Sequence, residues 1–559
     1  MTNREVATIL ERIADIMQIK EDNSFKVRAY RQAAQSVYHL DEDIRNLYAK
    51  NRLNDIPGVG KAIEKKIADM IEKGYCELYE RLKSEVPPGV LDMLAIPGLG
   101  HKTVKLIYNE LGISNLDDLL QAAQQKKIRA LPGLGGKTEY NIKKGIELLN
   151  QTRGKVTLGL AYPAAQRLRD YLLSFDWVEK AEITGSVRRG KPLVGDIDIL
   201  VVTHHPERIK EKIINYRDLQ KILIAEDDHI KGVLRLNIEF EVIIVSAPDY
   251  YAKLLWTTGS SDHRNQLVDK YNFNINDFTG TSTEQAIYEQ LNLAYIPPEL
   301  RENKGELEAA EARHLPQLIN LADIKGDLHV HSDWSDGAHK IQEMVEAARL
   351  MNYSYLAITD HSKSLPISGG LNEVRLAAQC KVIDEINNNS GDIFVFKGIE
   401  VDILRDGQLD FESDILDQLD IVVASVHSNF KLDREKQTQR IIKAIRNPHV
   451  NIIGHLSGRL LNRRSGYEID TDKILHEALV NNVALEINSH PDRLDIDEDI
   501  ARKARDMGVK IAINSDAHDK NDLRLQMYGV INARRGWLEK NDVINTWDKA
   551  TLMQFLKKK

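Results

Sequence analysis

The chain has 559 residues, 42% of them hydrophobic and 29% charged, and this length excludes a fold built on one core. The net charge of −8 argues against indiscriminate binding to nucleic acid. No apolar run approaches the roughly 18 residues of a membrane span, and the first residues lack the apolar segment of a secretory signal. Because the only cysteines are Cys76 and Cys380, we exclude a disulfide framework and expect a cytoplasmic protein.

The first 150 residues are predicted to be helical and to contain an internal repeat. An apolar-Pro-Gly-apolar-Gly pattern occurs at residues 56–60, 96–100 and 131–135, each time followed by a basic helical stretch. A tight glycine turn between two helices exposes backbone N–H groups that can bind a phosphate oxygen. The repeat resembles the helix-hairpin-helix motif, which binds the DNA backbone without reading its sequence. The resemblance implies DNA contacts at Gly58, Gly60, Gly98, Gly100, Gly133 and Gly135.

A region of mixed strands and helices follows, from about residue 155 to residue 295. Its most informative part is a Gly-Ser-Val-Arg-Arg-Gly segment at residues 185–190, followed by Gly-Asp-Ile-Asp at residues 195–198. Alternation along a strand places Asp196 and Asp198 on one face, with their Cα atoms about 7 Å apart. Two carboxylates so placed can hold two Mg²⁺ ions for phosphoryl transfer. The glycine turn and Arg189 can hold a triphosphate through backbone donors and a fixed cation.

This combination resembles the palm of nucleotidyltransferases, particularly that of family X DNA polymerases. Residues 256–260, Trp-Thr-Thr-Gly-Ser, stand where the family carries an aromatic pair and Thr-Gly-Ser beside the nucleotide sugar. The resemblance implies that Asp196 and Asp198 bind both metal ions, Mg²⁺ or Mn²⁺. It also implies contacts to the incoming nucleotide from Gly185, Ser186, Arg189, Gly195, Thr258 and Gly259.

Two positions depart from the family pattern. The third catalytic carboxylate, usually an Asp, falls on Glu241, with Glu239 on the same strand face as the alternative. The additional methylene of Glu241 can displace the carboxylate by about 1 Å, so we expect a weaker polymerase than its relatives. Trp256 and Thr257 replace the usual Tyr-Phe pair, which leaves the discrimination against ribonucleotides open.

A lysine after the first glycine turn is a second candidate for catalysis. In some family X members, a lysine at this place forms a Schiff base with an abasic sugar and removes it. Alignment on Gly60 places Lys66 there, beside Lys65. A cluster of lysines can lower the pKa of one amine and make it nucleophilic. The alternative is that these lysines only bind phosphates from a solvated helix.

After residue 322, strands alternate with amphipathic helices, which predicts a parallel barrel or sheet. Seven apolar runs between Asp327 and His518 each end in His, Asp or Glu. Because parallel strands end at one rim, we expect these side chains to converge. Imidazoles and carboxylates without thiolates are typical ligands of Zn²⁺- or Mn²⁺-like ions. The pattern therefore predicts a metal-dependent hydrolase.

The same segments resemble the PHP (polymerase and histidinol phosphatase) domain, from Asp-Leu-His-Val-His at residues 327–331 to Asp-Ala-His at residues 516–518. The resemblance implies a distorted seven-stranded β/α barrel with three ions, Zn²⁺ and/or Mn²⁺. It implies that His329, His331, Glu400 and Asp516 surround one ion, that Glu400 and His427 hold a second, and that Asp336, His361, His455 and His518 serve the third. Asp360 is expected to orient a neighbouring ligand, and Glu486 to line the substrate cleft.

The predicted fold is multidomain, with an all-α helix-hairpin-helix region, an α+β nucleotidyltransferase palm with a thumb, and a C-terminal distorted (β/α)7 PHP barrel. The expected boundaries are 1–80 for an N-terminal helical domain, 81–152 for a fingers-like helical domain, 153–245 for the palm, 246–300 for the thumb, 301–322 for a linker and 323–559 for the PHP domain.

The expected function is that of a DNA-repair polymerase that fills short gaps and carries a metal-dependent 3′-5′ exonuclease, which can also open abasic sites. Its partners would be deoxynucleoside triphosphates and DNA with gaps, nicks or abasic sites, and we expect a monomer without a membrane partner. The alternative is a PHP-type phosphomonoesterase with a degenerate polymerase region. The three glycine turns argue against it, because a small phosphate ester needs no surface that follows a nucleic-acid backbone. The intact carboxylates and imidazoles argue against a scaffold without catalysis.

Overall fold

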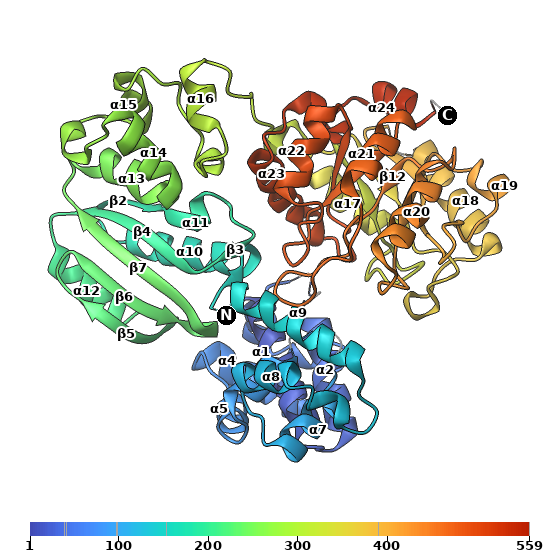
Figure 1. Cartoon of the computed structure of the whole chain (residues 1–559), viewed down its shortest axis with the longest axis horizontal. Helices are drawn as coiled ribbons and strands as arrows, with labels where there is room; N and C mark the ends of the chain where they lie inside the picture. Colours follow the sequence, from blue (N-terminus) through green and yellow to red (C-terminus); the bar gives the residue numbers. More distant parts are fainter. Residues whose placement is uncertain are drawn as a thin grey trace. The chain divides into compact units, whose positions relative to one another are not determined.

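The computed structural model describes residues 1–557 except residues 39, 41, 95, 97, 98, 153 and 390. The chain divides into two compact units, one formed by Met1–Lys155 with Leu460–Ser465 and the other by Val156–Arg459 with Gly466–Lys559. Figure 1 labels their helices and strands. None of the helices in this described part is both long and apolar enough to cross a membrane.

The first unit is helical. Its helices are α1 (Asn3–Ile19), α2 (Ser24–Tyr38), α3 (Ile44–Ala49), α4 (Lys61–Glu72), α5 (Glu77–Ser84), α6 (Pro88–Leu94), α7 (His101–Leu111), α8 (Leu116–Gln124) and α9 (Gly136–Thr152). A capping box starts α1, where Thr2 and Glu5 satisfy each other's backbone N–H groups. The apolar faces of the helices bury Leu10, Ile13 and Ile67 in a common interior.

Each of the three predicted glycine turns contains the same type of backbone hydrogen bond. Val59 N donates to the Ile56 carbonyl oxygen at 2.9 Å, and equivalent bonds of 3.0 and 3.1 Å join Leu99 to Ile96 and Leu134 to Leu131. Gly58 and Gly133 have φ of +80° and +76°, a conformation that favours glycine, while Gly98 lies outside the described residues. No side chain caps α4 or α7 at Gly60 or Gly100, so their first N–H groups are available to an anion. The helix-hairpin-helix prediction is confirmed.

The second unit begins with a five-stranded sheet in the order β2-β4-β7-β6-β5. Its strands are β2 (Val178–Ile183), β4 (Asp196–Thr203), β5 (Leu219–Ala225), β6 (His229–Leu234) and β7 (Ile238–Val245), with α10 (Leu158–Leu173) and α12 (Pro206–Ile214) beside them. The central strands β4 and β7 are parallel, and the other pairs are antiparallel. Period-2 alternation buries Ile197 and Ile199 of β4, which leaves Asp196 and Asp198 on the opposite face.

A helical thumb follows the sheet, with α13 (Tyr250–Thr258), α14 (Ser261–Tyr271), α15 (Glu284–Gln290) and α16 (Glu306–Glu311). The expected linker at 301–322 is corrected by this part of the structure. Arg301 is fully buried, donates to Glu284 at 2.6 Å, and lies 5.4 and 5.6 Å from the ring centroids of Tyr288 and Tyr295. Glu306 is equally buried and pairs with His263 at 2.6 Å. The polar residues that suggested a linker are partners of buried charges, so the segment packs with the thumb.

The C-terminal domain is a seven-stranded parallel sheet in the order β14-β13-β12-β11-β10-β9-β8. Its strands are β8 (Gly326–Val330), β9 (Tyr355–Ile358), β10 (Phe394–Asp402), β11 (Ile421–Ser425), β12 (Ile452–Ile453), β13 (Ala484–Asn488) and β14 (Ile511–Asn514). The helices around them are α17 (Ile341–Leu350), α18 (Glu373–Asn389), α19 (Ser413–Leu416), α20 (Arg434–Ile445), α21 (Thr471–Val480), α22 (Glu498–Met507), α23 (Gln526–Arg535) and α24 (Lys549–Leu556). His331 N donates to the Ala517 carbonyl oxygen at 2.9 Å, so the first and last strands meet. This nearly closed barrel confirms the predicted fold class.

Candidate active sites

The carboxyl ends of the barrel strands bring the predicted imidazoles and carboxylates together, as expected for a parallel barrel. Among the described residues, potential ligand atoms within 4.8 Å of one another form three groups: His331, Asp336, His361 and His518; His329, His331 and Asp516; and His361, Glu400 and His427. Shared members connect the groups, since His331 and His361 each belong to two of them. The geometry is that of a site for several adjacent cations.

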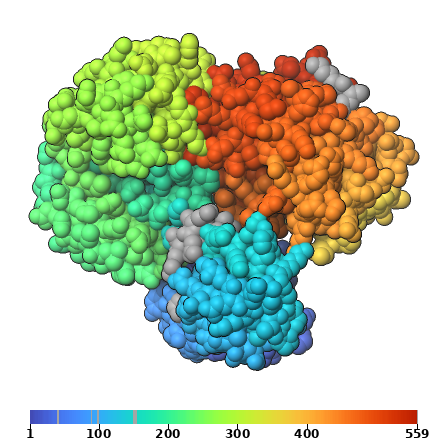
Figure 2. Space-filling view, viewed as in Figure 1, coloured from blue at the N-terminus to red at the C-terminus, as the bar shows by residue number. Residues whose placement is uncertain are grey.

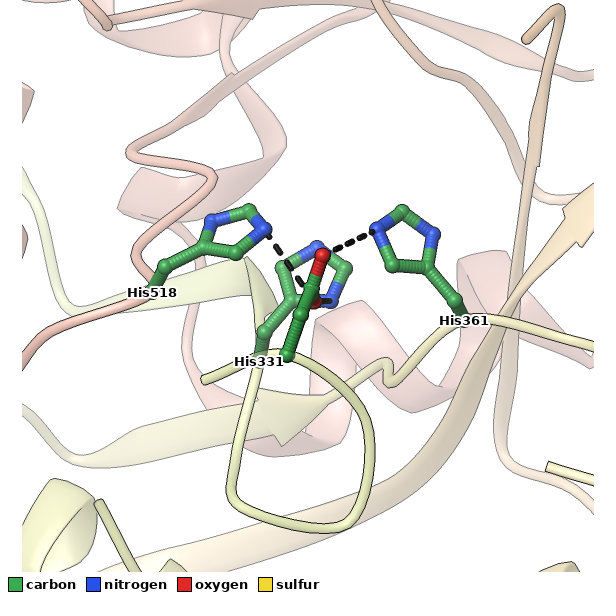
Figure 3. Close-up of side chains that lie close together, drawn as sticks. His331, His361 and His518 are labelled. Carbon is green, nitrogen blue, oxygen red and sulfur yellow. Dashed lines mark ion pairs between the residues drawn. The ribbon is translucent and has the colours of Figure 1, made fainter. Parts of the chain in front are cut away.

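Asp336 comes from the loop after β8 and faces three imidazoles. His518 Nε2 lies 3.4 Å from one of its oxygens and His361 Nε2 3.5 Å from the other, and Figure 3 shows His331 between these two rings. Burial alone would raise the pKa of Asp336, but hydrogen bonds from His361 and His518 outweigh it and lower the pKa. The carboxylate is therefore ionised and available as a ligand.

Glu400 is the centre of the second half of the site. It is 1% exposed and lies 2.7 Å from His361 Nδ1, 3.1 Å from His455 Nε2 and 3.3 Å from His427 Nε2. His455 was expected in the group of Asp336, but the structure places it beside Glu400. Burial opposes ionisation of Glu400, yet the surrounding imidazoles lower its pKa well below the usual value. One carboxylate among several imidazoles can bridge two cations.

Further acidic residues orient these ligands. Glu486 accepts from His329 Nδ1 at 2.7 Å and, through its other oxygen, from the His455 backbone N–H at 2.8 Å. It is fully buried, so it fixes the His329 ring and the backbone of His455 and does not line a cleft. Asp402 lies 3.3 Å from His427 Nδ1, a contact that its position two residues after Glu400 could have suggested. Asp360 accepts from the Ser332 N–H at 2.8 Å and so supports the loop that carries Asp336, while its orientation of a neighbouring ligand stays a prediction.

The donor set fits divalent cations. Among the described residues, His329 Nε2 and His331 Nδ1 are buried and have no hydrogen-bond partner. Burial and the neighbouring His518 and His361 lower the pKa of His331 to about 3, so its ring is neutral, the form that binds a metal. Unpaired buried polar atoms are costly, and a cation would satisfy both.

The second candidate site is on the face of the palm sheet. The register of β4 and β7 places Asp196 opposite Glu239 and Asp198 opposite Glu241. Gly185, at the start of the short helix α11 (Gly185–Arg188), packs against Asp198, because a Cβ there would lie 1.8 Å from the Asp198 Oδ2. Its φ of +60° also favours glycine. The glycine turn and the acidic strand are therefore fixed against each other.

The palm carboxylates repel one another in a partly desolvated place. Burial first, and then the charges of Asp196 and Glu241, raise the pKa of Asp198 to about 7. Burial also raises the pKa of Asp196, although Lys231 opposes this. Glu241 contacts His229 on β6, a partner that the sequence pattern did not indicate. A divalent cation would relieve the repulsion among the three carboxylates, so this cluster also fits a metal.

The other predicted contacts are placed as follows. Ser186 Oγ is buried and, within the described residues, unpartnered, and Gly195 is exposed beside Asp196. Arg189 is already engaged, since Nε donates to Glu302 at 2.9 Å and Nη1 to the Thr258 carbonyl oxygen at 2.7 Å. Thr258 is fully buried. The turn and the end of α13, where Gly259 follows, are thus joined through Arg189.

In the first unit, Lys66 is half-buried on α4 and Lys65 is exposed. No described contact of Lys66 assigns it a partner in an ion pair, and its position after the first glycine turn is the one expected from the sequence. The Lys66 amine therefore lies on the same helix as the uncapped N-terminus of α4, near the surface.

Comparison with known proteins agrees with these domains. Residues 1–76 match the helix-hairpin-helix domain, 90–147 the SAM-like helix-hairpin-helix tandem, 165–252 the nucleotidyltransferase domain and 327–490 the PHP domain. The chain is 36% identical over 573 residues to the DNA polymerase/3′-5′ exonuclease PolX of Bacillus subtilis (strain 168), which covers 100% of both chains. A probable phosphatase of Thermoanaerobacter sp. (strain X514) is 33% identical over 244 residues, 42% of this chain and 94% of its own length.

A helix-hairpin-helix region, a palm with paired carboxylates and a PHP barrel in one chain define a family X-type DNA polymerase joined to a metal-dependent hydrolase. The full-length identity to the Bacillus subtilis protein is more specific. The chain belongs to the PolX family.

We predict that Asp198→Asn stabilises the protein without metal ions, while it abolishes nucleotide addition. The folded-state pKa of about 7 exceeds the ordinary value of 3.8. The carboxyl group therefore carries no penalty below about pH 4, and the penalty grows as the pH rises and is complete above about pH 7. Thermal unfolding with a chelator should show a gain of roughly 2–4 °C at pH 8 and none near pH 4. Asp227→Asn, on the exposed part of the palm, is the control, and an equal gain at both pH values would contradict the argument.

Proposed function

We propose that this protein extends 3′ ends in short DNA gaps by template-directed nucleotide addition and removes 3′-terminal nucleotides in its barrel. It would act as a monomer on DNA with gaps, nicks or abasic sites, and the barrel would also open abasic sites. One observation supports this most strongly, namely two separate clusters of cation ligands in a chain with three glycine turns. The full-length similarity to a relative named a DNA polymerase/3′-5′ exonuclease supports both activities together.

In the palm, Asp196, Asp198 and Glu241 would hold Mg²⁺ or Mn²⁺, which supplies charge neutralisation for the transferred phosphoryl group. The start of α11 has no side-chain cap, so its N–H groups and the Ser186 hydroxyl can donate to phosphate oxygens. We assign to Glu241 the acceptance of the primer 3′-hydroxyl proton, because a carboxylate at this strand position faces the same side as Asp198.

In the barrel, the residues that would hold Zn²⁺ and/or Mn²⁺, three ions in this proposal, are His329, His331, Asp336, His361, Glu400, His427, His455, Asp516 and His518. Such ions lower the pKa of a bound water molecule and neutralise a phosphodiester. The chain's own contribution is orientation, since Glu486 and Asp402 hold the rings of His329 and His427.

A phosphomonoesterase with a degenerate palm is the second candidate, since the probable phosphatases match only 42% and 34% of this chain. It has less support, because the palm keeps Asp196, Asp198 and Glu241 on one face and Gly185 packed against Asp198. A palm that had lost its function would not need this glycine.

We predict that the two activities are lost separately. On labelled gapped DNA with Mn²⁺, Asp196→Ala should lose at least roughly 100-fold in extension and keep degradation, because it removes a carboxylate of the palm only. His329→Ala should lose degradation by a similar factor and keep extension. Gel analysis of products longer and shorter than the primer measures both. Degradation that persists in His329→Ala would mean that the nuclease lies elsewhere.

We further predict that Glu241→Asp raises the rate of nucleotide addition. The shorter side chain restores the carboxylate position of the family pattern and ends the contact with His229, and a correction of about 1 Å can change a rate roughly tenfold. Glu239→Asp is the matched control, since Glu239 is exposed on the same face. Single-turnover incorporation measures the effect, and an unchanged or lower rate in Glu241→Asp would refute the side-chain-length argument.

We assign removal of an abasic sugar to Lys66. Borohydride should trap the wild-type protein on DNA with a 5′-incised abasic site, since a Schiff base is reduced to a stable amine. Lys66→Ala should lose most of this crosslink, whereas Lys65→Ala, one residue away and exposed, should keep it. Equal trapping in both variants would leave the lysines as phosphate-binding groups only.

A further inference from the structure

The glycine turn of the palm packs directly on a helix of the PHP domain. Gly190 ends the turn with φ of +66°, and a Cβ at this residue would lie 2.1 Å from the Cγ2 of Ile531 on α23. In the space-filling view, the yellow-green surface of the chain near residue 300 borders the red surface of residues toward the C-terminus (Figure 2). The turn therefore depends on the barrel as well as on its own sheet.

Arg535, the last residue of α23, makes the contact specific. Its Nη1 donates to the Arg189 carbonyl oxygen at 2.8 Å and to Glu302 at 3.0 Å, while Nη2 donates to Glu498 at 2.8 Å. The side chain is 1% exposed. A planar guanidinium with three acceptors in fixed directions holds geometry better than a lysine ammonium can.

Glu302 joins this arginine to the side chain of Arg189. Its Oε1 accepts from Arg189 Nε at 2.9 Å and from Arg535 Nη1 at 3.0 Å, and Lys191 Nζ lies 3.3 Å from Oε2. Within this cluster, three cations, Arg189, Lys191 and Arg535, face two carboxylates, Glu302 and Glu498. Glu302 therefore has cationic partners besides Arg189.

We propose that Arg535 and Glu302 are positioning residues for nucleotide addition, so that the PHP helix α23 holds the triphosphate-binding turn of the polymerase. The proposal rests on the proposed function of the palm. Glu302 keeps Lys191 and Arg535 as partners when Arg189 turns its guanidinium toward a phosphate. Arg535 thereby lowers the cost of freeing Arg189, because no buried carboxylate is left unpaired.

The test compares two neighbouring arginines of α23. Arg535→Met removes the contact to the turn. Arg534→Met removes an ion pair between the barrel and the thumb, since Arg534 donates to Glu299 at 2.6 Å, and its other described acceptors are the Ile319 carbonyl oxygen and Asn320. We expect Arg535→Met to raise the KM for the deoxynucleoside triphosphate roughly tenfold, with the KM for primed DNA and the exonuclease rate within about twofold of wild type. Arg534→Met should leave all three within about twofold.

Arg535→Lys keeps the positive charge but lacks the planar guanidinium, so it should restore the KM for the nucleotide only in part. Glu302→Gln is a second variant that keeps the shape of the cluster, and it should also raise the nucleotide KM. It serves as the test if Arg535→Met does not fold. An unchanged nucleotide KM in these variants, or an equal rise in Arg534→Met, would overturn the proposal. If the wild-type protein adds no nucleotide, the proposed function fails instead, and the two failures are distinguishable.

Discussion

Charge buried at the ends of apolar strands is the constraint on which the structure depends. Glu400 is 1% exposed and has imidazoles of His361, His427 and His455 within 3.3 Å. An isolated carboxylate in such a place costs several kcal/mol, so the imidazoles must carry protons or a cation must replace those protons. The parallel barrel makes this arrangement possible, because strands with apolar interiors bring all their ends to one rim. The topology of the parallel barrel is thus what brings these imidazoles and carboxylates together.

The palm also places carboxylates at the end of an apolar strand, but on a face of the sheet that is more open to solvent. Its sheet is mixed, with one face packed and the other open, so that Asp196 and Asp198 are half-buried. There the repulsion among carboxylates raises the pKa of Asp198, whereas in the barrel the imidazoles lower the pKa of Glu400. The imidazoles of the barrel site thus favour the charged form of Glu400, and the palm site is acidic. An acidic, open face suits ions that neutralise a large anionic substrate, and a closed rim of imidazoles and carboxylates suits ions held by the protein.

The gathering of these imidazoles and carboxylates could be predicted from the sequence, because all except the loop residue Asp336 follow an apolar run, and the run fixes both the strand and its end. Their pairing could not be predicted. His455 lies beside Glu400 and not with Asp336, because the length and tilt of each strand decide which ends are neighbours. The partner of Arg189 could not be predicted for the same reason, because its guanidinium donates to Glu302, which is more than a hundred residues away in the sequence. Polarity alone suggested a linker at 301–322, yet Arg301 and Glu306 are buried partners of Glu284 and His263.

The residues that hold the palm and thumb against the barrel differ from those that fix the orientation of the contact. Trp537 of the PHP domain packs into the apolar cluster of the thumb, and the guanidinium of Arg502 lies 4.0 Å from its ring centroid. Such apolar burial is non-directional and holds two domains together without fixing their register. Buried ion pairs contribute little net stability, since desolvation offsets the attraction, but they require defined geometry. Because Arg535 is placed where it contacts the glycine turn, the costly polar part of the interface is also the part that orients a catalytic element. An interface selected for stability alone would have an apolar side chain at that position.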